Sequence, residues 1–255
     1  MARIAQLALL TGTVGLLACG HRRVALSPTP EPAVPPGFDH VVVAIDSLER
    51  GIALLREATG VTPRLIGTNS GRGGGADPGA GSRSAIIGLG PGRFLELVAP
   101  AAPDSGGAPN SASYAIYHTL TPIGWAMRTP DSDSLRAALT ARALRVQGLY
   151  DGERRQPDGK TVRWRVIMPW FGISTVPPFF VDWDRSAGAH PSADAPSGCT
   201  LTALTLAYPP SVADTLRAQL ARAGVHAIVT PASRQSIDLT LDCPTGRVTL
   251  PGGRG

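Results

Sequence analysis

The sequence predicts an α+β fold built from repeated modules, each with the order strand, helix, strand, strand, strand. Strands that could open such a module start near residues 38, 123 and 200, so the repeat is about 80 residues long. An amphipathic helix and three short strands follow each opening strand. Apolar residues make up 43% of the 255 residues, which suits the packed core of one large or two small domains.

The N-terminus has the features of a bacterial export signal. Arg3 is followed by an apolar stretch over 4–18, which is shorter than the roughly 20 residues that a membrane-spanning helix needs. It ends in "LLAC", which resembles a bacterial lipobox. We therefore predict a lipoprotein signal peptide over 1–18 and a lipid on Cys19, which would anchor the protein to a membrane of the cell envelope, exposed to the periplasm or the cell exterior. The alternatives are an ordinary cleaved signal and a buried helix with a chance cysteine.

A Pro-rich linker, predicted over 19–37 together with the lipidated cysteine, would hold the folded part away from the membrane. The net charge of +5 does not indicate a nucleic-acid partner. Lys160 is the only lysine, and the arginines are scattered along the chain, whereas a nucleic-acid surface requires clustered positive charge.

The first module begins with "FDHVVVAI", whose β-branched run predicts a strand over 38–45. The helix that follows has Ser47 as its N-cap and Gly60 as its C-terminal stop, and apolar residues recur along one face. Short strands are predicted over 62–67, 82–88 and 93–98.

The second and third modules repeat this order. Their opening strands are "IGWAMRT" and "LTALTLAY", and their helices are predicted over 132–143 and 211–224. The strands that complete the two modules are expected over 145–150, 161–168, 178–183, 226–230, 236–241 and 247–250.

Several of these segments resemble the glyoxalase-like domain of the vicinal oxygen chelate superfamily. The likeness rests on "FDHVVVAIDSLERGIALL" and "GRFLELVAP" in the first module, and on "GWAMRT", "PFFVDW", "HPSADAPSG" and "LTALTL" further along. In that superfamily two βαβββ modules pair side by side, and their curved sheets form a cup. The resemblance implies a two-module glyoxalase-like domain over 38–185, and a loop with a third βαβββ module over 186–255.

The superfamily commonly holds a divalent metal in the cup, with ligands from the first and last strands of each module. Strand alternation places His40 opposite the β-branched face of its strand, and Glu96 can face the same side. In the second module Trp125 replaces one ligand, and Asp182 occupies the position of the other. The resemblance therefore implies a site of His40, Glu96 and Asp182 that suits Mn, Fe or Mg, and Zn less well.

Each of these ligands also has a structural alternative. His40 could cap the start of its strand, and Asp182 could close a sheet edge. Glu96 could pair with a buried arginine such as Arg83 or Arg163, because a buried carboxylate is costly unless it is paired or coordinated.

Aromatic residues and a second histidine complete the candidate site. Trp125, Trp164 and Phe180 are candidates for contacting a ligand in the cup, with core packing as the alternative. His190 lies in a loop expected to cover the cup. It joins Glu96 as a candidate acid–base residue, with hydrogen bonding inside the loop as the alternative.

The two cysteines other than Cys19 are expected to form a disulfide. Cys199 opens the first strand of the third module, and Cys243 lies in the turn before its last strand. If a helix crossover makes these strands parallel, both cysteines lie at the same end of the sheet, in a compartment where disulfides persist. The third module either caps the cup or pairs with its counterpart in a homodimer.

Two function classes follow from the resemblance. One is a metal-dependent enzyme acting on a small organic molecule, as a lyase, isomerase or dioxygenase. The other is a membrane-anchored module that binds or sequesters a small molecule without metal or catalysis. An envelope scaffold without a ligand is a third possibility, and the fold alone does not choose among them.

Overall fold

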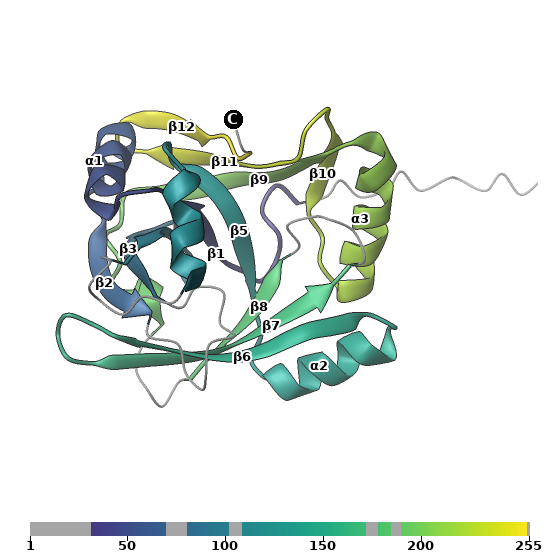
Figure 1. The fold of residues 1–255 in the computed structure, drawn as a ribbon. Helices are drawn as coiled ribbons and strands as arrows, with labels where there is room; N and C mark the ends of the chain where they lie inside the picture. Colours follow the sequence, from purple (N-terminus) through teal and green to yellow (C-terminus); the bar gives the residue numbers. More distant parts are fainter. Residues whose placement is uncertain (1–31, 70–80, 102–108, 172–177, 185–189, 254–255) are drawn as a thin grey trace, which may run out of the picture. The chain divides into compact units, whose positions relative to one another are not determined.

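The computed structural model describes residues 32–69, 81–101, 109–171, 178–184 and 190–253 (Figure 1). The predicted signal peptide over 1–18 and Cys19 lie outside the described residues, as does most of the linker. None of the helices in the described ranges has the length and apolar character needed to cross a bilayer.

The first module has the predicted order of elements. Helix α1 begins after Ser47, whose side chain accepts a hydrogen bond from the amide of Arg50, and it ends at Gly60 with a φ of 74°. The elements of this module are β1 (Phe38–Ala44), α1 (Leu48–Thr59), β2 (Arg64–Asn69), β3 (Ser82–Gly88) and β4 (Phe94–Pro100).

The second module repeats the order after a connecting 3-10 helix, η2 (Pro109–Ile116). Helix α2 is capped by Asp131, which accepts hydrogen bonds from the amides of Asp133 and Ser134. The elements are β5 (Thr121–Arg128), α2 (Ser132–Ala141), β6 (Arg145–Arg155), β7 (Thr161–Trp170) and β8 (Phe179–Trp183).

The two modules form one closed mixed sheet of eight strands, in the order β1-β4-β3-β2-β6-β7-β8-β5. In each module the opening strand pairs in parallel with the last strand, and β1 and β5 pair antiparallel across the module boundary. The other junction is short, since β2 pairs with β6 through Thr68 and Asn69. The predicted fold class, two paired βαβββ modules with a further one, is confirmed.

Alternation along the strands gives the closed sheet two different faces. Val41, Val43, Leu95 and Leu97 point outward into the main hydrophobic core, together with side chains of α1 and of the third module. The opposite face of the same strands carries smaller, separate apolar clusters and several polar side chains. Because the outer face is buried in the main core, the inner face is the one available for a ligand site.

The third module keeps the predicted order of elements but pairs its strands differently. Its sheet has the order β10-β9-β11-β12, with β10 parallel and β11 antiparallel to β9. In the first module, by contrast, the opening strand lies beside the last strand. The elements are β9 (Thr200–Tyr208), α3 (Pro210–Ala223), β10 (Ile228–Pro231), β11 (Ser236–Cys243) and β12 (Gly246–Leu250).

Cys199 and Cys243 form a disulfide in this sheet. The geometric reason differs from the one expected from the sequence. Cys243 ends β11, which runs antiparallel to β9, and Asp242 pairs directly with Thr200. The start of β9 therefore meets the end of β11, without any parallel pairing between the first and last strands of the module.

We expect the disulfide to be measurable in the full chain carrying Cys19→Ser. The denatured, unreduced protein should titrate no free thiol, and the reduced protein should titrate two. Because the bond closes a loop with a sequence separation of 44 residues, its loss in Cys199→Ser should lower the free energy of unfolding by about 2–4 kcal/mol in urea denaturation. Two thiols in the unreduced protein would show that the bond does not form.

Candidate functional site

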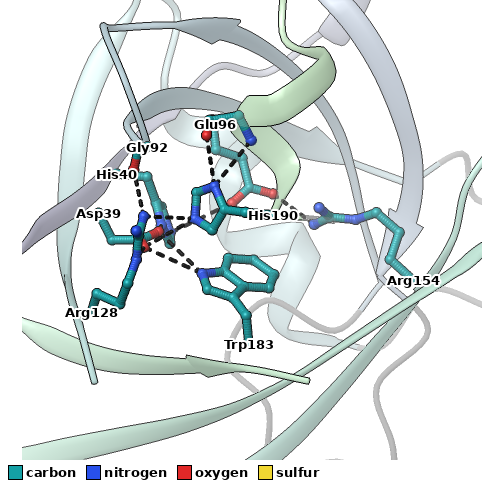
Figure 2. A network of polar contacts seen from close by, with 9 residues as sticks. Asp39, His40, Gly92, Glu96, Arg128, Arg154, Trp183 and His190 are labelled. Atoms are coloured by element: carbon teal, nitrogen blue, oxygen red, sulfur yellow. Dashed lines mark hydrogen bonds and ion pairs between the residues drawn. The ribbon is translucent and has the colours of Figure 1, made fainter. Parts of the chain in front are cut away.

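His40 and Glu96 converge on the inner face of the closed sheet, as strand alternation predicts (Figure 2). The His40 ring stacks on Phe94 of β4, with a centroid distance of 4.5 Å, and it meets Phe179 of β8 edge-on at 5.4 Å. Its Nε2 atom lies 3.9 Å from Oε2 of Glu96. His40 therefore sits between the two modules, in contact with strands of both.

Asp39, the residue before His40, is the centre of a buried polar network. Its carboxylate is fully buried and accepts hydrogen bonds from Nε of Arg128 at 2.8 Å and from Nε1 of Trp183 at 3.3 Å. It is also 2.7 Å from Nδ1 of His40 and 3.1 Å from Nε2 of His190. Asp39 thus connects β1, β5, β8 and the segment that begins at His190.

A bulge explains how consecutive residues of β1 can both join this network. The pairing of β1 with β5 shifts register between Phe38 and His40. Such a shift lets neighbouring side chains leave the strict alternation of a strand. Phe38 points into the outer core, while the side chains of Asp39 and His40 meet each other.

The network keeps Asp39 ionised. Burial alone would raise the pKa of the Asp39 carboxyl, but hydrogen bonds from His190 and His40 outweigh burial and hold this pKa far below its usual value. An ionised carboxylate can only accept, so Nδ1 of His40 carries a proton and donates it to Asp39. This arrangement directs Nε2 of His40 towards Glu96.

Glu96 pairs with Arg154 of β6, whose guanidinium donates to Oε1 at 2.6 Å and to Oγ of Ser84 at 3.3 Å. Burial opposes ionisation of Glu96, but the charges of Arg154 and His40 outweigh it, so the pKa of Glu96 is lowered. Glu96 therefore pairs with a buried arginine, as the structural alternative proposed, but this arginine is Arg154.

The two arginines named from the sequence have other partners. Arg83 pairs with Glu49 at 2.7 Å, and Arg163 pairs with Glu153 at 2.8 Å.

Asp182 does not join this group, so its assignment as a metal ligand is wrong. Its carboxylate accepts a hydrogen bond from the amide of Ser132, at the start of α2, over 2.9 Å. Phe179 and Val181 pack on the inner face, and Asp182 alternates with them. Asp182 would face inward only if β8 were shifted by one residue, because a shift of one residue exchanges the two faces of a strand.

Two residues proposed to contact a ligand also face the outer side of the sheet. Trp125 and Phe180 are buried in the outer core, and the inner face of β5 carries Ala126 instead. Trp164, by contrast, packs on the inner face, with its ring 5.6 Å from that of Trp183 and 5.2 Å from the guanidinium carbon of Arg154. Of the three aromatic candidates, only Trp164 lies on the inner face, beside Arg154 and Trp183.

His190 joins the inner-face network through the carboxylate of Asp39. Its Nδ1 accepts from the amide of Ser192 at 3.2 Å, and its ring packs edge-on against Trp183 and Phe94. With Nε2 held by Asp39, both ring nitrogens have partners. These contacts support the alternative, in which His190 holds its segment in place by hydrogen bonds, more than they support a role in acid–base chemistry.

The residues present do not fit the expected divalent metal. Of the three proposed ligands only His40 and Glu96 converge, and the guanidinium of Arg154 lies against the Glu96 carboxylate. A cation in that position repels a second one. No group of three or more His, Cys, Asp or Glu side chains in the described ranges could hold a metal ion.

Four residues of the network were missed in the sequence: Asp39, Arg128, Arg154 and Trp183. Asp39 directly precedes His40 in the sequence, but only His40 was considered, as a metal ligand or as a cap of the strand start. Trp183 could have been found by correcting the register of β8 by one residue. Nothing local marks Arg154, because its partner lies 58 residues away.

We expect Asp39→Asn to lower the free energy of unfolding by about 2–4 kcal/mol at pH 7, because it replaces a buried carboxylate, which accepts hydrogen bonds from Arg128 and Trp183, by an amide that cannot accept them all. The folded-state pKa of Asp39 is depressed, so its stabilising contribution is present above the unfolded pKa and declines as pH falls below it. Urea denaturation between pH 7 and pH 3 should therefore show a weaker acid destabilisation in the variant. Asp151→Asn, which removes a partner of the half-exposed Arg165, is the control and should cost less than about 1 kcal/mol. Equal effects of the two substitutions would contradict this assignment.

Comparison with known proteins agrees with the fold. Among curated proteins no sequence matches the chain significantly. A hypothetical protein from Staphylococcus aureus has a similar structure, with 14% identity, 86% of each chain covered and a TM-score of 0.56. Methylmalonyl-CoA epimerase from Mycobacterium tuberculosis aligns over 66% of this chain and 100% of its own, with 18% identity and a TM-score of 0.38. The family described as the glyoxalase-like domain matches residues 38–224, which cover both modules of the closed sheet and part of the third. The chain belongs to this family of glyoxalase-like domains.

Proposed function

We propose that the inner face of the closed sheet binds a small organic molecule through an oxygen atom, at a site formed by Arg154, His40 and Glu96. The observation that carries the proposal is the state of Arg154. Its side chain is only 7% exposed, and its Nε is the one buried side-chain polar atom in the described ranges without a hydrogen-bond partner. A buried donor without an acceptor costs about 1–3 kcal/mol, which an oxygen of a ligand would relieve.

The surroundings of Arg154 support an organic ligand. Trp164, Trp183 and Phe179 lie on the same face, and Trp183 and Phe179 remain partly exposed. Solvent therefore reaches side chains that are suited to packing against carbon atoms. The charges of Arg154 and Glu96 compensate each other, which favours a carbonyl or carboxylate group held by hydrogen bonds over a highly charged ligand.

One observation favours a catalytic role in addition. Nε2 of His40 faces Glu96 at 3.9 Å, while Nδ1 is held by Asp39. A ligand hydroxyl or acidic carbon lying beside both groups could exchange a proton with either of them. This candidate function needs no metal, and it would place the protein among the isomerases or lyases expected from the resemblance.

The N-terminal prediction completes the proposal. Lipid on Cys19 would tether the domain to a membrane of the cell envelope, where its ligand would be a molecule of the periplasm or the cell exterior. This part rests on the sequence "LLAC" and the preceding apolar stretch.

We expect Arg154 to determine binding of small carboxylates. Pyruvate, glyoxylate and malonate serve as probes, titrated by calorimetry into the full chain carrying Cys19→Ser. The double variant Arg154→Met/Glu96→Gln removes both charges and so avoids a buried unpaired carboxylate. It should weaken the affinity for the responding probe about 10- to 100-fold.

The matched control is Arg163→Met, which removes an arginine of β7 that pairs with Glu153 instead. It should bind like the parent, and EDTA should leave the affinity unchanged. Unaltered binding in the double variant would refute the proposal, and an affinity abolished by EDTA would favour the metal-dependent alternative.

We expect the lipid anchor to depend on Cys19. When the full chain is expressed in a bacterium, it should sediment with the membrane fraction, whereas Cys19→Ser should appear in the soluble fraction. Cys199→Ser is the control and should stay in the membrane fraction. A parent protein found only in the soluble fraction would rule out the anchor.

A further inference from the structure

A pocket of about 300 Å³ lies away from the inner-face network, at the junction of β6 and β7. It is lined by Arg145, Val146 and Gln147 from the start of β6 and by Trp170 from the end of β7. Arg145 and Trp170 are directly opposite each other in the antiparallel pair. Side chains of such a pair stand next to each other on one face of the sheet.

Trp170 is the most exposed of the four tryptophans, at 43%, whereas Trp125 and Trp164 are buried. No ring contact or hydrogen bond of Trp170 to another side chain occurs in the described ranges. An indole exposed to this extent lacks part of the apolar burial that normally stabilises tryptophan. It therefore offers a flat surface on which another ring can stack.

The pocket also contains two polar side chains, those of Arg145 and Gln147. In the part of the chain that the structure describes, neither Arg145 nor Gln147 has an ion-pair or side-chain hydrogen-bond partner. Three other arginines of β6 and β7 do have carboxylate partners: Arg154 pairs with Glu96, Arg163 with Glu153 and Arg165 with Asp151. The pocket thus combines the positive charge of Arg145 with amide and indole N–H donors, and none of its described lining residues carries a carboxylate.

We infer that this pocket is a second binding site, which takes a flat ring compound bearing a carboxylate. The ring would stack on Trp170, and the carboxylate would receive hydrogen bonds from Arg145, whose planar guanidinium matches two carboxylate oxygens. Gln147 would add a neutral donor. The site shares no residue with the group formed by Arg154, His40 and Glu96.

The test uses 2-naphthoate as the probe and uncharged 2-naphthamide as its matched control, each titrated by calorimetry into the full chain carrying Cys19→Ser. Naphthoate should bind more tightly than naphthamide. Arg145→Gln should weaken naphthoate binding about three- to tenfold and remove the preference over naphthamide, since the site is exposed and its charge is partly screened. Trp170→Ala should abolish binding of both compounds.

Two controls separate this site from other effects. Arg136→Gln removes an exposed arginine of α2 that pairs with Asp133, and it should leave naphthoate binding unchanged. The double variant Arg154→Met/Glu96→Gln should also bind naphthoate normally, so failure of the inner-face proposal would leave this one standing. Loss of naphthoate binding in either control, equal binding of the two compounds, or no binding by the parent chain would overturn the inference.

Discussion

The buried carboxylate of Asp39 is the constraint on which the rest of the inner face depends. A charge without solvent is tolerated only when other groups compensate it fully, and here Arg128, Trp183, His40 and His190 all direct N–H groups at the same carboxylate. These partners come from both modules and from the segment that precedes the third. A single charge therefore fixes the relative positions of β1, β5 and β8, and it fixes the orientation of His40.

The orientation of His40 matters for the chemistry of the site, because Asp39 holds Nδ1 and Nε2 then faces Glu96. His40 and Glu96 lie where the resemblance implied metal ligands. Asp182, the third proposed ligand, instead accepts a hydrogen bond from an amide at the start of α2. Arg154 takes part of the space and supplies positive charge next to Glu96. In this chain a guanidinium thus compensates the carboxylate, a task that a metal ion would otherwise perform.

The sequence predicted features that depend on local patterns. The order of the modules, the boundaries of α1 at Ser47 and Gly60, and the inward position of His40 and Glu96 all follow from periodicity and capping. Asp182, Trp125 and Phe180 were misassigned because β5 and β8 were aligned one residue out of register, and alternation then reverses every side chain. Arg154 and the strand order of the third module depend on long-range pairing, which no local pattern contains.

The matching of charges on the inner face has a kinetic consequence. Two carboxylates, Asp39 and Glu96, stand against two guanidinium groups, Arg128 and Arg154, so their long-range fields largely cancel. These four groups would then add little electrostatic steering to the approach of a dissolved anion. Selectivity at this face would therefore arise from how long a molecule stays bound and not from how fast these groups attract it.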